Sequence, residues 1–163
     1  MDETFEQYSR RRWSALVRAA YLMCGDVAGS EDIAQDALVR LYRVWSRRNS
    51  DIISIDAYVH RIVVNLVSRR WRERSREVLL PEVPDSEARL PDGSLSDQLR
   101  IALLQLPPKM RAVVVLRFYL QMSVHDTAAT LRCAEGTVKS HTSEALRRLR
   151  TTVDRGEVRN ERC

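Results

Sequence analysis

Apolar residues recur along the chain three and four positions apart, the spacing of an amphipathic helix, and no stretch alternates strictly enough to predict a strand. In the first half of the chain the spacing predicts helices over about residues 5–24, 30–45 and 55–74. The glycines at positions 25 and 29 are expected to separate the first two helices. Ser30 is expected to be the N-cap of the second helix, because its hydroxyl can accept a hydrogen bond from an unpaired backbone amide.

Each of these helices has one apolar stripe, and together the stripes predict the core of a small helical bundle. The predicted core residues are Trp13, Leu16, Val17, Ala20 and Met23 in the first helix, Ile33, Ala37, Leu38, Leu41, Tyr42 and Trp45 in the second, and Val59, Ile62, Val63, Leu66 and Val67 in the third. The remaining positions are mostly polar or charged and are expected to face solvent or a partner.

Prolines and acidic residues cluster in the middle of the chain and predict a flexible linker over residues 78–94. Helical spacing resumes at Ser96, a candidate cap. Pro107 is expected to end that helix, and Pro108 fits the first turn of the next. Two further helices are predicted over residues 123–131 and 134–153.

The fold class predicted from this order of elements is all-α, with two small helical domains joined by a flexible linker. The expected divisions are an N-terminal helical bundle over residues 1–76, a linker over 77–95, a C-terminal four-helix domain over 96–155 and a tail over 156–163.

The last two predicted helices have the proportions of a helix-turn-helix. Ser123 is expected to cap the first of them, and Arg132 to Ala134 to form the turn. The exposed face of the second helix holds Thr137, Lys139, Ser140, His141, Glu144, Arg147 and Arg148. Such a helix can enter the major groove of duplex DNA. The alternative is an ordinary amphipathic helix with a solvated charged face.

The third predicted helix combines arginines, aromatic residues and one amide beside its apolar stripe. Tyr58, Arg61, Asn65 and Arg69 are examples. Aromatic rings stack on bases and guanidinium groups hold phosphates, so this helix suits single-stranded DNA. A solvated basic end is the alternative. The mixed polar face of the second helix is interpreted either as solvated surface or as a docking face for a protein partner.

Composition excludes several other functions. The net charge of the 163-residue chain is +5, which is compatible with a polyanionic partner but does not by itself identify one. The three cysteines are scattered, so neither a zinc site nor another cofactor is expected, and reduced thiols in a cytoplasm are the simplest interpretation. No apolar run is long enough to span a membrane. The histidines are scattered and no phosphate-binding glycine loop occurs, so catalysis is not expected.

Four segments taken together are similar to a known family. They are SEDIAQDALVRLYRVW, DAYVHRIVVNLVSRRWRER, LLQLPPKMRAVVVLRFYLQMS and EGTVKSHTSEALRRLR. In this order and spacing they resemble the two conserved domains of bacterial extracytoplasmic-function (group 4) sigma factors of the sigma-70 family, and most of all the short actinobacterial forms. The resemblance covers the chain from about Phe5 to Arg150.

The resemblance implies a cytoplasmic, non-catalytic protein that binds core RNA polymerase and promoter DNA. It implies that the −10 element is read as a melted single strand and the −35 element as duplex. Members of the family are commonly held by an anti-sigma factor, so such a partner is also expected. The alternative is a free-standing regulator that binds duplex DNA through the helix-turn-helix alone.

The resemblance also assigns residues to each partner. The polymerase-binding residues are expected to be Asp32, Gln35, Asp36 and Arg40. Asn65 is expected to read a base of the −10 element, with Arg61, Arg69, Arg70, Arg72 and Tyr58 beside it on the melted strand, and the loop over residues 46–56 to cap a flipped base. The −35 element is expected to meet Thr137, Lys139, Ser140, His141, Glu144, Arg147 and Arg148.

Three positions depart from the family pattern in the helix-turn-helix. Arg132 stands where glycine is usual, Ala134 where a capping serine is usual, and Thr127 where an aliphatic residue is usual. The loss of a cap costs typically ~1 kcal/mol. These departures predict a less stable C-terminal domain.

Overall fold

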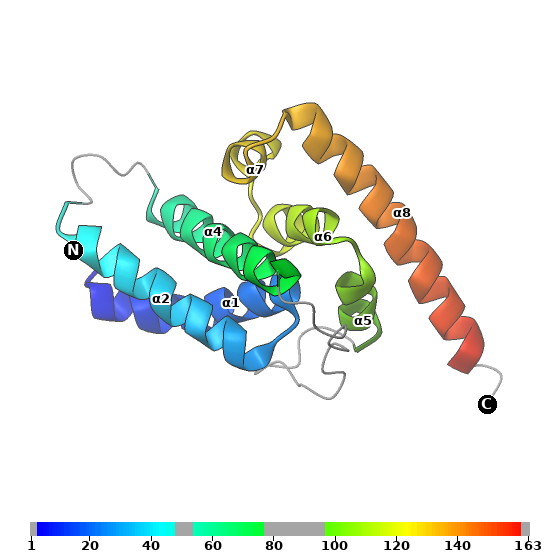
Figure 1. Cartoon of the computed structure of the whole chain (residues 1–163), viewed down its shortest axis with the longest axis horizontal. Helices are drawn as coiled ribbons and strands as arrows, with labels where there is room; N and C mark the ends of the chain where they lie inside the picture. The colour runs from blue at the N-terminus through cyan, green and yellow to red at the C-terminus, as the bar shows by residue number, and fades with distance from the viewer. Residues whose placement is uncertain (1–2, 48–53, 77–96, 161–163) are drawn as a thin grey trace. The chain divides into compact units, whose positions relative to one another are not determined.

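The structure is a computed structural model and describes residues 3–47, 54–76 and 97–160 (Figure 1). The chain divides into two compact units, Met1–Val83 and Pro84–Cys163. All the regular elements in the described residues are helices, which confirms the predicted all-α class with two helical domains. The predicted linker over 77–95, the predicted cap Ser96 and most of the loop over 46–56 lie outside the described residues.

The N-terminal unit contains α1 (Phe5–Cys24), α2 (Val27–Trp45) and α4 (Ile55–Arg76), and each of these helices packs against the other two (Figure 1). Leu16 of α1, Leu41 of α2 and Val63 of α4 are fully buried in the core that they share. The three predicted helices of the first domain are therefore present, and the middle of each predicted stripe is buried.

The ends of α1 follow from local chemistry. Thr4 and Gln7 form a reciprocal capping box at its start, in which the Thr4 hydroxyl accepts from the Gln7 amide at 3.2 Å. Gly25 ends the helix in the left-handed region at φ 75°, and its amide donates to the carbonyl of Tyr21. Glycine adopts this conformation without a steric penalty.

The predicted start of α2 is wrong. The helix begins at Val27, with Asp26 at the N-cap position, and Ser30 lies inside it, fully buried, with its hydroxyl donating to the carbonyl of Val27 at 2.7 Å. Gly29 was expected to lie between the first two helices, but it lies inside α2. A Cβ at Gly29 would lie 2.5 Å from the guanidinium of Arg70 on α4, so the glycine is explained by a tertiary contact.

The predicted burial of Tyr42 is also wrong, because its side chain is 64% exposed. It lies at the edge of an aromatic cluster, with its ring centroid 5.0 Å from that of Phe5. Trp45 is half-buried and contacts the rings of Phe5 and Tyr8. The N-terminal residues of α1 pack against one side of the α2 stripe, and Tyr42 lies at its edge, where it contacts Phe5 but leaves most of its surface exposed.

The C-terminal unit contains α5 (Asp97–Gln105), α6 (Pro108–Val114), a π-helical turn η1 (Val115–Tyr119), α7 (Val124–Leu131) and α8 (Glu135–Asn160). The helix α8 packs against α5, α6 and α7 (Figure 1). Pro107 and Pro108 separate α5 from α6 as predicted. The helix predicted to begin at Pro108 passes into the π-helical turn, and α8 continues beyond its predicted end, through the first residues of the expected tail.

The predicted helix-turn-helix is present as α7 and α8. The Ser123 hydroxyl accepts from the Asp126 amide at 3.0 Å, as its predicted role as a cap requires. Arg132 forms the turn in the left-handed region at φ 55°, with its amide donating to the carbonyl of Ala128. Ala128 and Val138 are buried against Val113 of α6, with Cys133 packed against the same cluster.

Candidate nucleic-acid and protein interfaces

One face of α4 collects five of the six residues predicted for the −10 element. At about 100° per residue, Tyr58, Arg61, Asn65, Arg69 and Arg72 fall within about 80° of arc around the helix. Tyr58 is half-buried and the other four are exposed. Their apolar neighbours on α4 point to the opposite side, into the core. We call these five residues the strand row.

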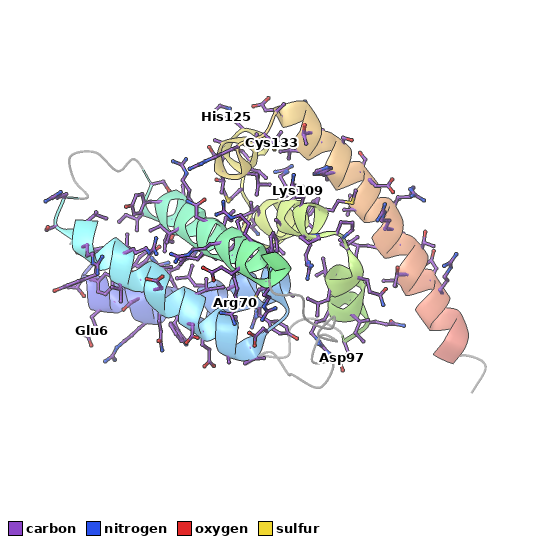
Figure 2. All side chains as sticks on the ribbon, in the orientation of Figure 1. Glu6, Arg70, Asp97, Lys109, His125 and Cys133 are labelled. Atoms are coloured by element: carbon purple, nitrogen blue, oxygen red, sulfur yellow. The ribbon has the colours of Figure 1, made fainter. Side chains whose placement is uncertain are left out.

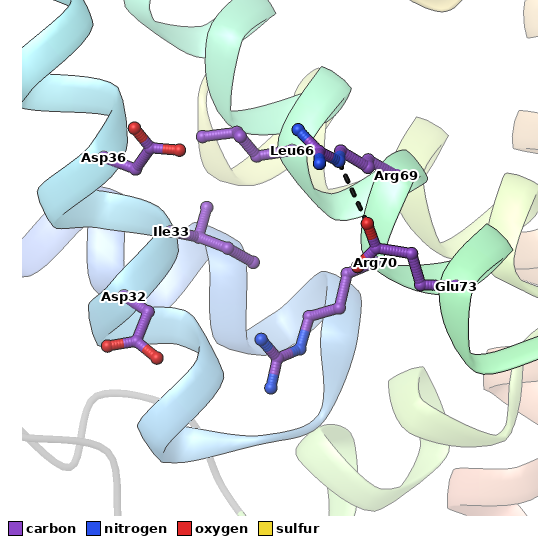
Figure 3. A pocket seen from close by; sticks show the side chains of 7 residues that line it. All are labelled: Asp32, Ile33, Asp36, Leu66, Arg69, Arg70 and Glu73. Carbon is purple, nitrogen blue, oxygen red and sulfur yellow. Dashed lines mark hydrogen bonds and ion pairs between the residues drawn. The ribbon is translucent and has the colours of Figure 1, made fainter. Parts of the chain in front are cut away.

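Arg70, the sixth predicted residue, does not belong to the strand row. It lies about 180° around α4 from Arg61. Its Nη2 is 2.7 Å from Oδ2 of Asp26, at the start of α2, and Arg74 Nη2 is 3.1 Å from the same oxygen. Figure 3 shows the Arg70 side chain extending toward the N-terminal end of α2, whereas Arg69 pairs with Glu73 along α4 at 3.0 Å.

A polar network joins α1 to the first turns of α4. The Tyr8 hydroxyl donates to Oδ1 of Asp56 at 2.7 Å, and Arg12 Nε lies 3.2 Å from the same oxygen. Arg12 Nη2 also donates to Nε2 of His60 at 2.9 Å. Burial, with a smaller effect from the Arg12 charge, lowers the pKa of His60 to about 4. Burial and the Asp56 carboxylate raise the pKa of Tyr8.

This network holds the start of α4 where the chain returns from the loop over residues 46–56. Sequence reasoning assigned no role to Arg12, Asp56 or His60 within it. Their partners are 48 positions away along the chain, so no local spacing could have revealed the contacts.

The predicted docking face of α2 is exposed and mixed in character. Asp32, Gln35 and Arg40 are exposed, and Asp36 is half-buried and paired with Arg40, with 3.2 Å between Oδ2 and Nη2. The same side of the helix exposes the apolar Val39, at 51%, and Tyr42. Sequence reasoning did not assign these two residues to the docking face. An aliphatic and an aromatic side chain exposed one turn apart can serve as apolar contacts for a protein partner.

A groove of about 300 Å³ separates the docking face from α4 (Figure 3). Asp32 and Asp36 line one wall, and Arg69, Arg70 and Glu73 line the other. Its floor is apolar, formed by Ile33 and Leu66. The groove therefore lies between the docking face and the strand row, and both sets of predicted residues contribute to it.

The exposed face of α8 holds the residues predicted for the −35 element. Thr137, Lys139, Ser140, Arg147 and Arg148 are exposed, and His141 and Glu144 are half-buried. A contact between the two helices lies near the start of α8, where Nδ1 of His125 in α7 is 3.0 Å from Oε1 of Glu135 (His125 is labelled in Figure 2).

Glu144 is the centre of an ion-pair cluster on this face. Arg147 donates to both of its carboxylate oxygens, at 2.6 and 3.0 Å, and Arg148 donates to Oε1 at 2.9 Å. Hydrogen bonds from Arg147 and then Arg148 lower the pKa of Glu144 to about 2. The carboxylate is therefore charged at neutral pH, and it orients two cations on the predicted DNA-facing side.

No described helix combines the length and the apolar character that crossing a bilayer requires. Within the same residues, no group of three histidine, cysteine, aspartate or glutamate side chains is placed to hold a metal ion.

Comparison with known families and proteins gives a consistent result for both units. The sigma-70 region 2 family matches residues 5–77, and the sigma-70 region 4 family matches residues 96–149. The chain is 40% identical to an RNA polymerase sigma-E factor of Streptomyces avermitilis, over 92% of this chain and 85% of that protein. It is 33% identical to the ECF RNA polymerase sigma factor SigM of Mycobacterium tuberculosis, over 89% of this chain and 74% of that protein.

A solved structure supports the same assignment. The sigma factor RpoE of Bartonella quintana, crystallised in complex with the anti-sigma factor NepR, superposes with a TM-score of 0.75 at 27% identity, covering 92% of this chain and 96% of that one. The fold, the two matched regions in their order and the identity to named sigma factors agree with one another. The chain therefore belongs to the sigma-70 family of RNA polymerase sigma factors, in its ECF branch.

Proposed function

We propose that this protein binds core RNA polymerase through the docking face of α2 and directs transcription initiation, with α4 reading the −10 element as a melted strand and α8 reading the −35 element as duplex. As a member of a family of non-enzymatic initiation factors, it contributes recognition rather than catalysis. The proposal for the individual residues goes beyond family membership and depends on the geometry of the three helices.

The proposal rests mainly on one observation: the N-terminal unit exposes two chemically different surfaces, the strand row on α4 and the docking face on α2. The strand row on α4 is cationic and contains an amide and an aromatic ring, which suits phosphates and splayed bases. The docking face on α2 is mixed, with Val39 and Tyr42 exposed among charged residues. A protein that bound only duplex DNA through a helix-turn-helix would need neither surface.

The helix-turn-helix supports the second half of the proposal. Lys139 and Ser140 lie in the first turns of α8, and recognition helices contact base edges through their N-terminal residues. Arg147 and Arg148 follow two turns later, exposed and paired with Glu144, so a phosphate would compete with that carboxylate for them. Glu144 lies between them and is charged, so it can accept from the amino group of a cytosine in the major groove.

The partners proposed for this chain are core RNA polymerase, promoter DNA and an anti-sigma factor, and its proposed location is the cytoplasm, where polymerase acts. The anti-sigma factor is proposed because RpoE of Bartonella quintana, similar in both units, was crystallised with one. A protein that covered the strand row and the docking face together would prevent both interactions at once.

In vitro transcription tests the proposal. Core polymerase from the same host, freed of its own sigma factors, is supplied with native DNA fragments with and without the purified chain. We expect new transcripts with defined starts, whose upstream regions share −10 and −35 elements. Tight duplex binding by the chain alone, with no start that depends on it, would favour the free-standing regulator instead.

A further inference from the structure

The contact between Arg70 and Asp26 joins the two helices to which the proposed function gives different partners. Arg70 and Arg74 both donate from Nη2 to Oδ2 of Asp26, at 2.7 and 3.1 Å. The side chains of all three residues are about two-thirds buried. We call these three residues the Asp26 latch.

At the start of α2, the Asp26 carboxylate forms the latch instead of the hydrogen bond that would cap the helix. Asp26 occupies the N-cap position, yet its carboxylate caps no backbone amide of α2 and is turned to the two arginines. At Gly29 a Cβ would lie 2.5 Å from Cζ and Nη2 of Arg70 and from Oδ2 of Asp26. A larger residue at position 29 would displace the guanidinium from its place beside the carboxylate.

The latch also removes Arg70 from the surface proposed for the melted strand. The strand row lies on one side of α4, and Arg70 leaves the helix on the other side, toward α2 (Figure 3). Its guanidinium is already paired with a carboxylate, so a phosphate would have to displace Asp26 to bind it. Arg69, its neighbour in sequence, is exposed and bonded only along its own helix, to Glu73.

We propose that Arg70 is a positioning residue: the Asp26 latch fixes α4, with its strand row, against α2, with its docking face, so that polymerase binding places Asn65 at the melted base. Arg70 itself does not contact the DNA strand. The inference rests on the proposed function, because it gives the latch a purpose only if α2 and α4 serve polymerase and DNA respectively.

A small shift of α4 along α2 would displace the base-reading residues from the DNA. A helix advances about 1.5 Å per residue, so a slip of one residue along α2 would move every residue of the strand row by that amount. Base recognition by an amide depends on hydrogen bonds that weaken steeply with distance and angle. Holding α4 at a single place on α2 therefore matters for opening the promoter even when docking itself is intact.

The experiment uses the full chain assembled with core polymerase on a promoter that the wild-type chain opens. Three variants disturb the latch: Arg70→Gln and Asp26→Asn remove a partner, and Gly29→Ala places a Cβ against both partners. We call them the latch variants. Arg69→Gln removes a neighbouring arginine from the strand row and is the matched control. Three quantities are measured: the affinity for core polymerase, the fraction of promoter opened, and the salt dependence of holoenzyme binding to a fork with a melted −10 strand. If the wild-type chain itself fails to bind the core, the proposed function fails before the latch is in question.

We expect the latch variants to bind core polymerase with the wild-type affinity but to open about two- to fivefold less promoter, the range for a partly exposed ion pair. Their salt slope should equal that of the wild type, because no phosphate contact is lost. Arg69→Gln should reduce the slope by about 0.7, the value for one contact to a single strand. The double variant Asp26→Asn, Arg70→Gln should open no less promoter than the worse single variant.

Two results with the assembled holoenzyme would overturn the inference. A reduced salt slope for Arg70→Gln together with normal opening by Asp26→Asn would make Arg70 a strand contact. A parallel loss of core affinity and opening in all the latch variants would indicate general damage to the bundle, with no specific role in positioning. As an independent check in the free protein, thermal unfolding of the wild type, Asp26→Asn, Arg70→Gln and the double variant measures the coupling between Asp26 and Arg70, and additive effects there would also contradict the latch.

Discussion

Nη2 of Arg12 lies 2.9 Å from Nε2 of His60, and this contact fixes the protonation of a buried imidazole. A guanidinium can only donate, so Nε2 must be the acceptor and His60 must be neutral. Burial of the imidazole, and to a smaller extent the Arg12 charge beside it, disfavours the protonated form and lowers the pKa of His60 to about 4.

The buried, neutral imidazole of His60 predicts that the N-terminal unit loses stability in acid. The folded-state pKa of His60, about 4, is below the unfolded value of 6.5, so the unfolded chain binds more protons between these values. Stability contributed by neutral His60 is complete above about pH 6.5 and is lost progressively as the pH falls toward 4. The total is of order 3 kcal/mol. Thermal unfolding of the wild type and His60→Gln across this range measures it.

In His60→Gln the amide oxygen can still accept from Arg12 but does not titrate. The difference in unfolding free energy between the two chains should therefore shrink steadily as the pH is lowered. A constant difference from neutral pH to pH 4 would mean that His60 is not the acid-sensitive group.

Ala134→Ser should stabilise the C-terminal unit. The carbonyl of Ala134 accepts from the amides of Thr137 and Val138, which places residue 134 at the N-cap of α8. A serine there can accept from the Thr137 amide, as Ser123 does from the Asp126 amide in α7. The expected gain is about 1 kcal/mol. Calorimetry of the full chain should show a higher midpoint for the C-terminal transition.

The same substitution at Ala129 is the control, because Ala129 is exposed within α7 and serine is a poorer helix former there than alanine. Ala129→Ser should lower the midpoint slightly. If Ala134→Ser also lowers it, the start of α8 is not limited by its missing cap.

Thr127→Val should stabilise the same unit by a different route. The Thr127 side chain is fully buried, and its Oγ1 has no hydrogen-bond partner. Valine keeps the shape and removes the unpaired hydroxyl, so a gain of about 1 kcal/mol is expected in denaturant unfolding. Thr142→Val is the matched comparison, because the Thr142 hydroxyl donates to the carbonyl of Val138 at 2.7 Å. Equal effects of the two substitutions would contradict the role assigned to the unpaired hydroxyl.

Local periodicity in the sequence predicts most of the fold and the location of the exposed faces. The helices of both units, the Ser123 cap and the alignment of Asn65 with Arg61 on α4 all follow from spacing within one helix. Where the sequence-based prediction is wrong, a contact from another helix decides the structure. Gly29 lies inside α2, where a Cβ would meet the Arg70 guanidinium, and Ser30 is too far into the helix to cap it.

The contacts between helices in the candidate site were likewise not predictable from the sequence. The Asp26–Arg70 pair joins residues 44 positions apart, and no single-sequence pattern connects them. The strand row and the exposed residues of α8 could be listed in advance because exposure repeats with the helical period. Arg69 is exposed and pairs along its own helix with Glu73, whereas Arg70 pairs across to Asp26, and only the packing of α4 on α2 reveals this difference.

Substitutions on the two faces of the N-terminal unit should separate docking from base recognition. Asn65→Ala should change selectivity at the upstream-most melted base by about five- to a hundredfold, the range for one good amide–base contact, while core binding is retained. Asp36→Arg should do the reverse, since it reverses a charge on the docking face and leaves the strand row unchanged. Promoter variants and core titrations measure the two effects. Loss of both activities in either variant would contradict the assignment of the faces.

The most direct measurement of the central claim is the equilibrium binding of the purified full chain to core RNA polymerase, free of other sigma factors and of any inhibitor. We expect a saturable one-to-one complex that Asp36→Arg weakens and Asn65→Ala does not. A chain that is folded by calorimetry yet shows no affinity for the core would contradict it.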